Sequence, residues 1–63
     1  MRFIIVDDNE NYIKEKNGVL SVTKEFNGLI IFGKRKAYKI LETLTNLGIY
    51  SYKAVVLEIT VQG

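Results

Sequence analysis

Three consecutive basic residues follow a glycine in the middle of this 63-residue chain. Side chains of this kind bind anions such as phosphate groups, nucleic-acid backbones and acidic protein surfaces. A helix that began at Lys34 would carry Arg35 and Lys39 on the same side, one turn apart. Its first backbone N–H groups would add further donors. The candidate binding site, here called the basic corner, comprises Gly33, Lys34, Arg35, Lys36 and Lys39.

The basic corner breaks a local rule of helix formation. A helix N-terminus carries partial positive charge and favours Ser, Asp or Glu over Lys and Arg. Sequences break such rules where something other than folding is served, so a contact with a protein, a nucleic acid or a nucleotide phosphate is one interpretation. The other is a solvated helix face that keeps an apolar protein in solution. Since the net charge is only +2, a protein partner is favoured over a nucleic acid.

Catalytic and metal-binding residue types are scarce. The chain has no cysteine and no histidine, which removes the commonest nucleophile, general base and transition-metal ligands. Neither serine, Ser21 or Ser51, lies in a Gly-x-Ser-x-Gly motif. The acidic run Asp7-Asp8-Asn9-Glu10 could hold a divalent cation, but it lacks the spacing of a calcium loop. We therefore interpret it as a turn, in which Asp and Asn are common. We therefore expect no enzyme, no catalytic residue, no metal and no cofactor.

Length and composition predict one small domain over residues 1–63. Hydrophobic residues make up 48% of the chain and charged residues 25%, which is typical of a globular protein. No apolar run approaches the roughly 20 residues of a membrane span. With no cysteine there is no sign of an oxidising compartment, so the expected location is cytoplasmic.

Two Asn-Gly dipeptides predict two β-hairpins. Asn17-Gly18 and Asn27-Gly28 would join strands over residues 12–16, 19–26 and 29–32 into an antiparallel meander. The first turn places Lys16 opposite Val19 and Ile13 opposite Val22. The second places Phe26 opposite Leu29.

The period of the apolar residues then changes to that of a helix, from Lys34 to about Leu47. Its apolar stripe comprises Ala37, Ile40, Leu41, Leu44 and Leu47, with Tyr38 at the margin, and Gly48 is placed to end it. An apolar run at residues 3–6 and an alternating segment at residues 53–61 complete the pattern. The predicted fold is α+β: an antiparallel sheet in the order β-β-β-β-α-β with one amphipathic helix packed on one face. The first and last strands are candidate neighbours.

One helix covers only one face of a sheet, so the strands carry more apolar surface than it can bury. A curled sheet could hide the surplus, but in so small a domain an interaction surface is favoured. The simplest partner is a second copy, which predicts a homodimer. Val56 is a further candidate for the open face. The expected interface residues are Tyr12, Val19, Ile30, Phe32 and Tyr38.

The segment Leu29-Ile30-Ile31-Phe32-Gly33-Lys34-Arg35-Lys36-Ala37-Tyr38-Lys39-Ile40-Leu41-Glu42-Thr43-Leu44 resembles a layout found in small phage and prophage accessory proteins. In these a strand ending in Phe leads through a short turn into a Lys-rich helix. The resemblance implies a viral accessory protein that acts by protein binding in the host cytoplasm, often as an inhibitor. It transfers no functional residue. A regulatory or antitoxin-like dimer is a further hypothesis.

Overall fold

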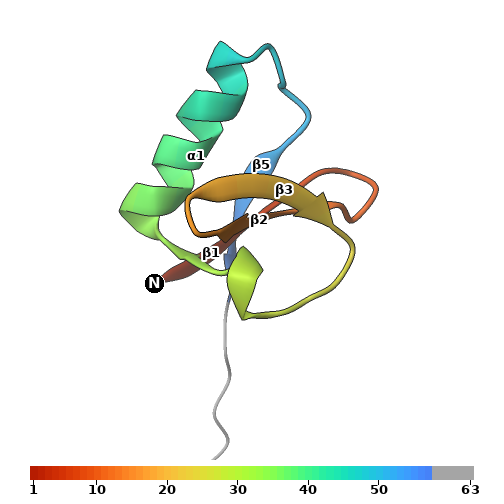
Figure 1. Ribbon diagram of the computed structural model, residues 1–63, viewed down its shortest axis with the longest axis vertical. Coiled ribbons are helices and arrows are strands. Elements are labelled where there is room, and N and C mark those ends of the chain that lie inside the picture. Colours follow the sequence, from red (N-terminus) through yellow and green to blue (C-terminus); the bar gives the residue numbers. More distant parts are fainter. Residues whose placement is uncertain (58–63) are drawn as a thin grey trace, which may run out of the picture.

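A five-residue strand, β1 (Arg2–Val6), lies at the centre of an antiparallel sheet of five strands. The computed structural model describes residues 1–57 (Figure 1). The predicted α+β fold, an antiparallel sheet with one helix packed on it, is confirmed. The other elements are β2 (Tyr12–Lys16), β3 (Val19–Thr23), the 3-10 turn η1 (Gly28–Ile30), β4 (Phe32–Gly33), α1 (Lys34–Asn46) and β5 (Lys53–Leu57).

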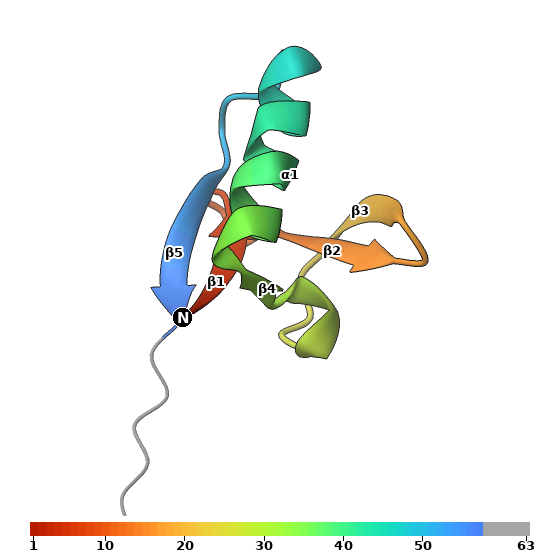
Figure 2. The same ribbon diagram turned by 90° about the vertical axis from the view of Figure 1, so that its left-hand side faces the viewer.

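Three strands share the two edges of β1. β5 pairs with it along its whole length, from Arg2 opposite Leu57 to Val6 opposite Lys53. The other edge is divided between β4, which pairs at Arg2 and Phe3, and β2, which pairs at Val6. The expected pairing of the first and last strands is thus confirmed, and it is antiparallel. Figure 2 shows β5 and β1 together on one side, with the β2–β3 hairpin projecting from the other.

The first predicted hairpin is confirmed in its register. Lys16 lies opposite Val19 and Ile13 opposite Val22. Asn17 and Gly18 both have positive φ angles, 54° and 79°. This is the backbone of the type I′ turn that Asn-Gly favours, whose twist matches that of the paired strands.

The second predicted hairpin is wrong. β3 ends at Thr23, and the Asn27 side chain caps η1 by accepting a 2.9 Å hydrogen bond from the Leu29 N–H. Asn has two common local uses, a left-handed turn and a side-chain cap. Here the cap prevails, because Phe32 is then free to pair with Phe3 in β1. The expected pair of Phe26 and Leu29 is accordingly not formed.

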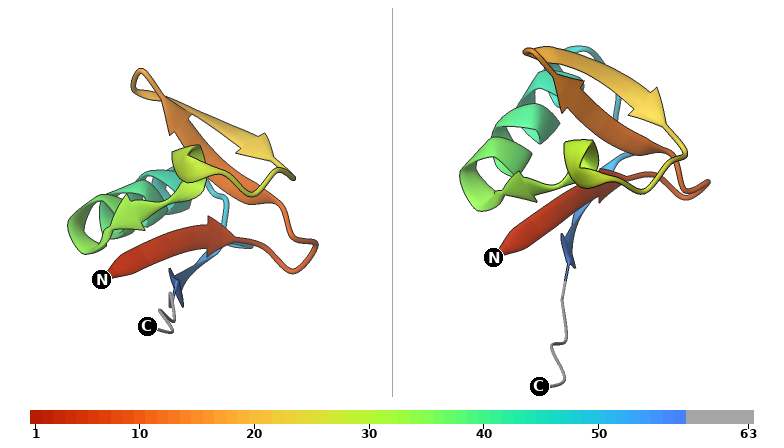
Figure 3. Two further views of the ribbon diagram at one scale, coloured as in Figure 1. Left: turned by 90° about the horizontal axis from the view of Figure 1, so that it is seen from below. Right: turned by 60° about the horizontal axis from the view of Figure 1, so that its bottom comes forward.

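The core lies between α1 and the sheet. It includes Phe3, Ile5, Ile13, Phe32, Ala37, Ile40 and Leu44. Ile30 is fully buried as well, and η1 packs against β2 (Figure 3). Ile30 and Phe32 were expected on an open face, and that prediction is wrong: both lie inside, because the segment after β3 folds back over the sheet. At these two positions the alternative of a curled sheet, which buries the apolar side chains, is correct, and the alternative of an interaction surface is not.

Helix α1 ends as predicted. Gly48 has a φ of 80°, its N–H bonds the Thr45 carbonyl, and the Ile49 N–H bonds the Leu44 carbonyl, both at 2.9 Å. These two bonds form the Schellman motif, which satisfies the last carbonyls of a helix. Within residues 1–57 no helix has the length and apolarity to cross a membrane. The predicted last strand is described as far as Leu57, and its residues 58–61 lie outside the described part.

Ile5 tests the importance of β1, because its side chain is fully buried at the centre of the sheet. We expect Ile5→Ala to lower the free energy of unfolding by about 2–5 kcal/mol, which a domain of this size can barely tolerate. Urea denaturation followed by circular dichroism measures the change. The control is Val19→Ala, since Val19 is 65% exposed and should lose less than about 1 kcal/mol. Equal losses would contradict the packing described here.

Candidate functional site: the basic corner and an apolar hollow

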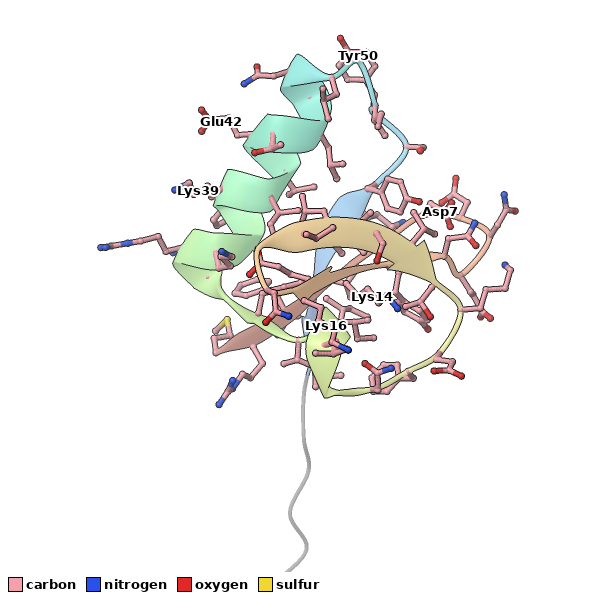
Figure 4. All side chains as sticks on the ribbon, in the orientation of Figure 1. Asp7, Lys14, Lys16, Lys39, Glu42 and Tyr50 are labelled. Atoms are coloured by element: carbon pink, nitrogen blue, oxygen red, sulfur yellow. The ribbon has the colours of Figure 1, made fainter. Side chains whose placement is uncertain are left out.

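The structure divides the basic corner between two sides of α1. Lys34, Arg35 and Lys39 line an open, shallow depression of 660 Å³ together with Tyr38 and Glu42. Figure 4 shows Lys39 and Glu42 projecting from the outer side of the helix, away from the sheet.

Lys36 lies on the other side of α1. Its Nζ is 2.9 Å from Oε2 of Glu15 in β2, which ties the helix to the hairpin. Lys36 therefore belongs with the structural contacts, although the basic run predicted it as a member of the anion site.

The backbone of Arg2 lies beside the start of α1. The β1–β4 pairing sets Arg2 directly opposite Gly33, the residue that precedes Lys34, and Arg2 is exposed. Sequence reasoning did not place this cation near the helix start, because a strand register between distant segments brings the two backbones together. The one signal in the sequence was that Arg2 directly precedes the apolar run at residues 3–6.

Tyr38 anchors the depression to the core. Its ring lies 6.2 Å from that of Phe3 at an angle of 49°, a tilted contact typical of aromatic pairs. The side chain is nevertheless 53% exposed. Tyr38 was predicted as an interface residue, and the structure gives it one packed side and one free side.

The backbone at Gly33 would accept a residue whose side chain could cap the helix. Gly33 has φ −71° and ψ 167°, ordinary extended values, and makes no side-chain cap. A Cβ atom placed there would meet nothing within 4 Å. Since a serine or aspartate would fit, the uncapped and positively charged start is a feature of the sequence rather than a steric necessity.

A second surface lies at the opposite end of α1. A hollow of 410 Å³ separates the hairpin from the end of the helix and the following loop. The Schellman motif places Leu44 and Ile49 together in its wall. Val22 and Leu47 are 55% and 69% exposed, so the hollow is open to solvent. This apolar hollow is lined by Ile13, Leu20, Ser21, Val22, Leu44, Leu47, Ile49 and Tyr52.

The sequence interpretation missed the apolar hollow as a site. Leu47 belongs to the predicted apolar stripe of the helix, which was expected to cover one face of the sheet. The helix extends beyond the sheet, so its last apolar turn has less to pack against than Ala37 and Ile40, which are buried.

The remaining predicted interface residues lie on the hairpin. Tyr12 is half-buried and makes an edge-to-face contact with Phe26, with ring centroids 5.7 Å apart. Val19 is exposed next to the turn. Neither borders the basic corner or the apolar hollow.

The acidic loop is organised by Asp7. Its Oδ1 accepts hydrogen bonds from the Asn9 and Asn11 N–H groups at 3.0 and 2.8 Å, and its Oδ2 accepts one from Asn11 Nδ2 at 2.9 Å. The bonds from Asn11, side chain first, hold the pKa of Asp7 below its usual value. Burial, and then the charge of Asp7, raise the pKa of Tyr52. Residues 1–57 contain no cluster of acidic side chains arranged to hold a metal ion.

Capping α1 tests whether its start is left unstable. We expect Gly33→Asp to raise the free energy of unfolding by about 0.5–1 kcal/mol, through a side-chain cap and attraction to the helix dipole. Thermal or urea unfolding measures the gain. Gly33→Ala is the control, because it shares the loss of backbone freedom but cannot accept a hydrogen bond. An equal gain in both variants would show that the cap is not the cause.

Asp7 makes stability depend on pH. Because folding lowers the pKa of Asp7, its contribution is present above the usual aspartate pKa and is lost as pH falls through the folded value. Asp7→Asn should therefore be less stable than wild type at neutral pH, with the difference shrinking as the pH falls below the usual aspartate pKa. Urea titrations across this range measure it. Asp8→Asn, at a 93% exposed side chain, is the control and should change stability little.

Comparison with known proteins adds no family to these observations. No protein-family model, curated protein or solved structure matches this chain. The basic corner and the apolar hollow are therefore assigned from their own geometry.

Proposed function

We propose that this chain is a small non-enzymatic binding protein that contacts an acidic protein surface through the basic corner. The observation that carries the proposal is the open, shallow depression that Lys34, Arg35 and Lys39 line together with the half-exposed Tyr38. Tyrosine and arginine are enriched in protein interfaces, where a flat aromatic surface combines with charge-assisted hydrogen bonds.

The arrangement of charge favours a protein over a nucleic acid. Glu42 closes one end of the depression, and a continuous phosphate backbone would be repelled there. Lys36 is paired with Glu15 and contributes less. A discrete acidic patch, which needs only two or three cations opposite it, suits this surface better than an extended polyanion.

The wider role that we propose follows the resemblance to phage accessory proteins. The chain would act in the host cytoplasm as an inhibitor or accessory factor, and as a homodimer that presents two basic corners. A regulatory or antitoxin-like dimer uses the same surfaces. The absence of cysteine and histidine from the sequence supports a role without catalysis.

Nucleic-acid or nucleotide-phosphate binding is the alternative, and Arg2 favours it. The β1–β4 register sets Arg2 opposite Gly33, next to the start of α1. Additional positive charge near the start of the helix would suit a phosphate-rich ligand.

A matched pair of charge variants tests the proposal. The first replaces Lys34, Arg35 and Lys39 with alanine, and the second replaces Lys14, Lys16 and Lys53, so both lose three positive charges. We expect the wild type and the second variant to capture the same partner from a lysate of the host. The first variant should capture at least ten-fold less of that partner. Quantitative mass spectrometry measures the capture. Equal capture by all three proteins would contradict a role for the basic corner.

Defined oligonucleotides separate the two candidates. Fluorescence anisotropy with duplex DNA and single-stranded RNA, at about 50 and 200 mM salt, measures any nucleic-acid binding and its loss as counterions compete. The proposed function expects no saturable binding at either salt concentration. Tight, strongly salt-dependent binding that the basic-corner variant abolishes would replace the proposal with the alternative.

A further inference from the structure

The outer edge of β3 is open and unprotected. In the part of the chain that the structure describes, β3 ends the strand order and pairs with β2 alone. Its five residues, Val19–Thr23, include no charge and no proline. Natural proteins usually protect such an edge with lysine, proline or a bulge, because its free N–H and C=O groups accept another strand. The uncharged edge of β3 therefore indicates that this strand pairs with a further strand.

The backbone of β3 is suited to antiparallel pairing with a copy of itself. The hairpin closes on a two-residue turn, so Lys16 and Val19 form a hydrogen-bonded pair and the ladder alternates from there. The N–H and C=O groups of Leu20 and Val22 therefore point outward. When two copies of β3 are centred on Ser21, Leu20 of each meets the second copy's Val22, and both have free groups to exchange.

The same pairing joins the two apolar hollows. Residues opposite each other in an antiparallel pair point to the same face, so both copies of α1 would lie on one side of a continuous sheet. Leu20 and Val22 line the hollow of each copy. Each hollow would then gain the second copy's Val22 as a neighbour, and the exposed side chains of Leu47 and Ile49 would approach one another across the twofold axis.

Charge also favours a second copy as the occupant. On the other face of the hairpin, which is turned towards η1 (Figure 4), Lys14 lies opposite Ser21. Across the axis the two copies of Lys14 would be separated by three strand spacings, about 14 Å. That exceeds the screening length of about 8 Å at physiological salt. No like charges meet, and the basic corners lie at the far end of each helix, about 20 Å from Leu47 along its axis.

We propose that the chain forms a twofold homodimer by β3–β3 pairing, with the two apolar hollows merged into one interface core. This inference rests on the homodimer of the proposed function and names its interface. The basic corners remain open on the outside, so the dimer would present both to a partner.

Two lysine substitutions test the interface. Sedimentation velocity over about 5–500 μM should show wild type changing from the 7.2 kDa monomer to a dimer as concentration rises. Val22→Lys should remain a monomer, because it brings charge to the merged hollows. Val56→Lys is the matched control: Val56 is 43% exposed on β5, at the opposite edge of the sheet, and the variant should dimerise like wild type. Circular dichroism checks that each variant is folded.

Cross-linking gives an answer even if Val22→Lys fails to fold. In the proposed pairing the two Ser21 residues face each other as a non-hydrogen-bonded pair with Cα atoms about 4.5 Å apart, within the range for a disulfide. The chain has no cysteine, so Ser21→Cys introduces a single thiol. Mild oxidation should convert most of it to a covalent dimer. Ser51→Cys, also exposed, is the control and should stay largely monomeric.

The outcomes separate the interface from the homodimer. A wild type that stays monomeric throughout would overturn both. A wild-type dimer that survives Val22→Lys, together with no selective cross-link at Ser21→Cys, would retain the homodimer and reject the β3 interface. Dissociation by Val56→Lys instead of Val22→Lys would place the interface on β5.

Discussion

β1 has only five residues with which to satisfy two strand edges and two sheet faces. β5 takes one edge completely, so β2 and β4 must divide the other. β2 pairs with β1 only at Val6, the last residue of β1, so the β2–β3 hairpin projects from the sheet. β4 meets it at the first residues and so fixes where α1 begins. Both surfaces of interest, the basic corner and the apolar hollow, follow from this division.

Helix α1 is stabilised along its side and at its end, whereas its start has no side-chain cap. Ala37, Ile40 and Leu44 are buried against the sheet, and the Schellman motif closes the C-terminus. Packing of an apolar face supplies most of the stability of a helix in a protein. The first turn is therefore free to carry Lys34 and Arg35 at a small cost. In this way the helix separates the residues that fold the protein from those that are available to a partner.

The sequence predicted what depends on local chemistry. The Asn17-Gly18 turn, the helix from Lys34 and its end at Gly48 each follow from residues close together in the chain. Asn27-Gly28 could not be assigned in the same way, since Asn serves both in turns and in caps and a distant contact, Phe32 with Phe3, accompanies the cap. Arg2 was missed for the same reason. The apolar hollow forms where the helix extends beyond the sheet, and no pattern of residues in the sequence predicts that position.

The pairing of β1 with β5 has a consequence for the order of folding. It joins Arg2 to Leu57, so the loop that it closes contains nearly all the described residues, and the entropy of closing a loop rises with its length. The hairpin, in contrast, needs only its own twelve residues, from Tyr12 to Thr23. Of the strands that the structure describes, β1 is synthesised first and β5 last. The strand on which the fold is centred must therefore wait for nearly all of the described residues before one of its edges is covered.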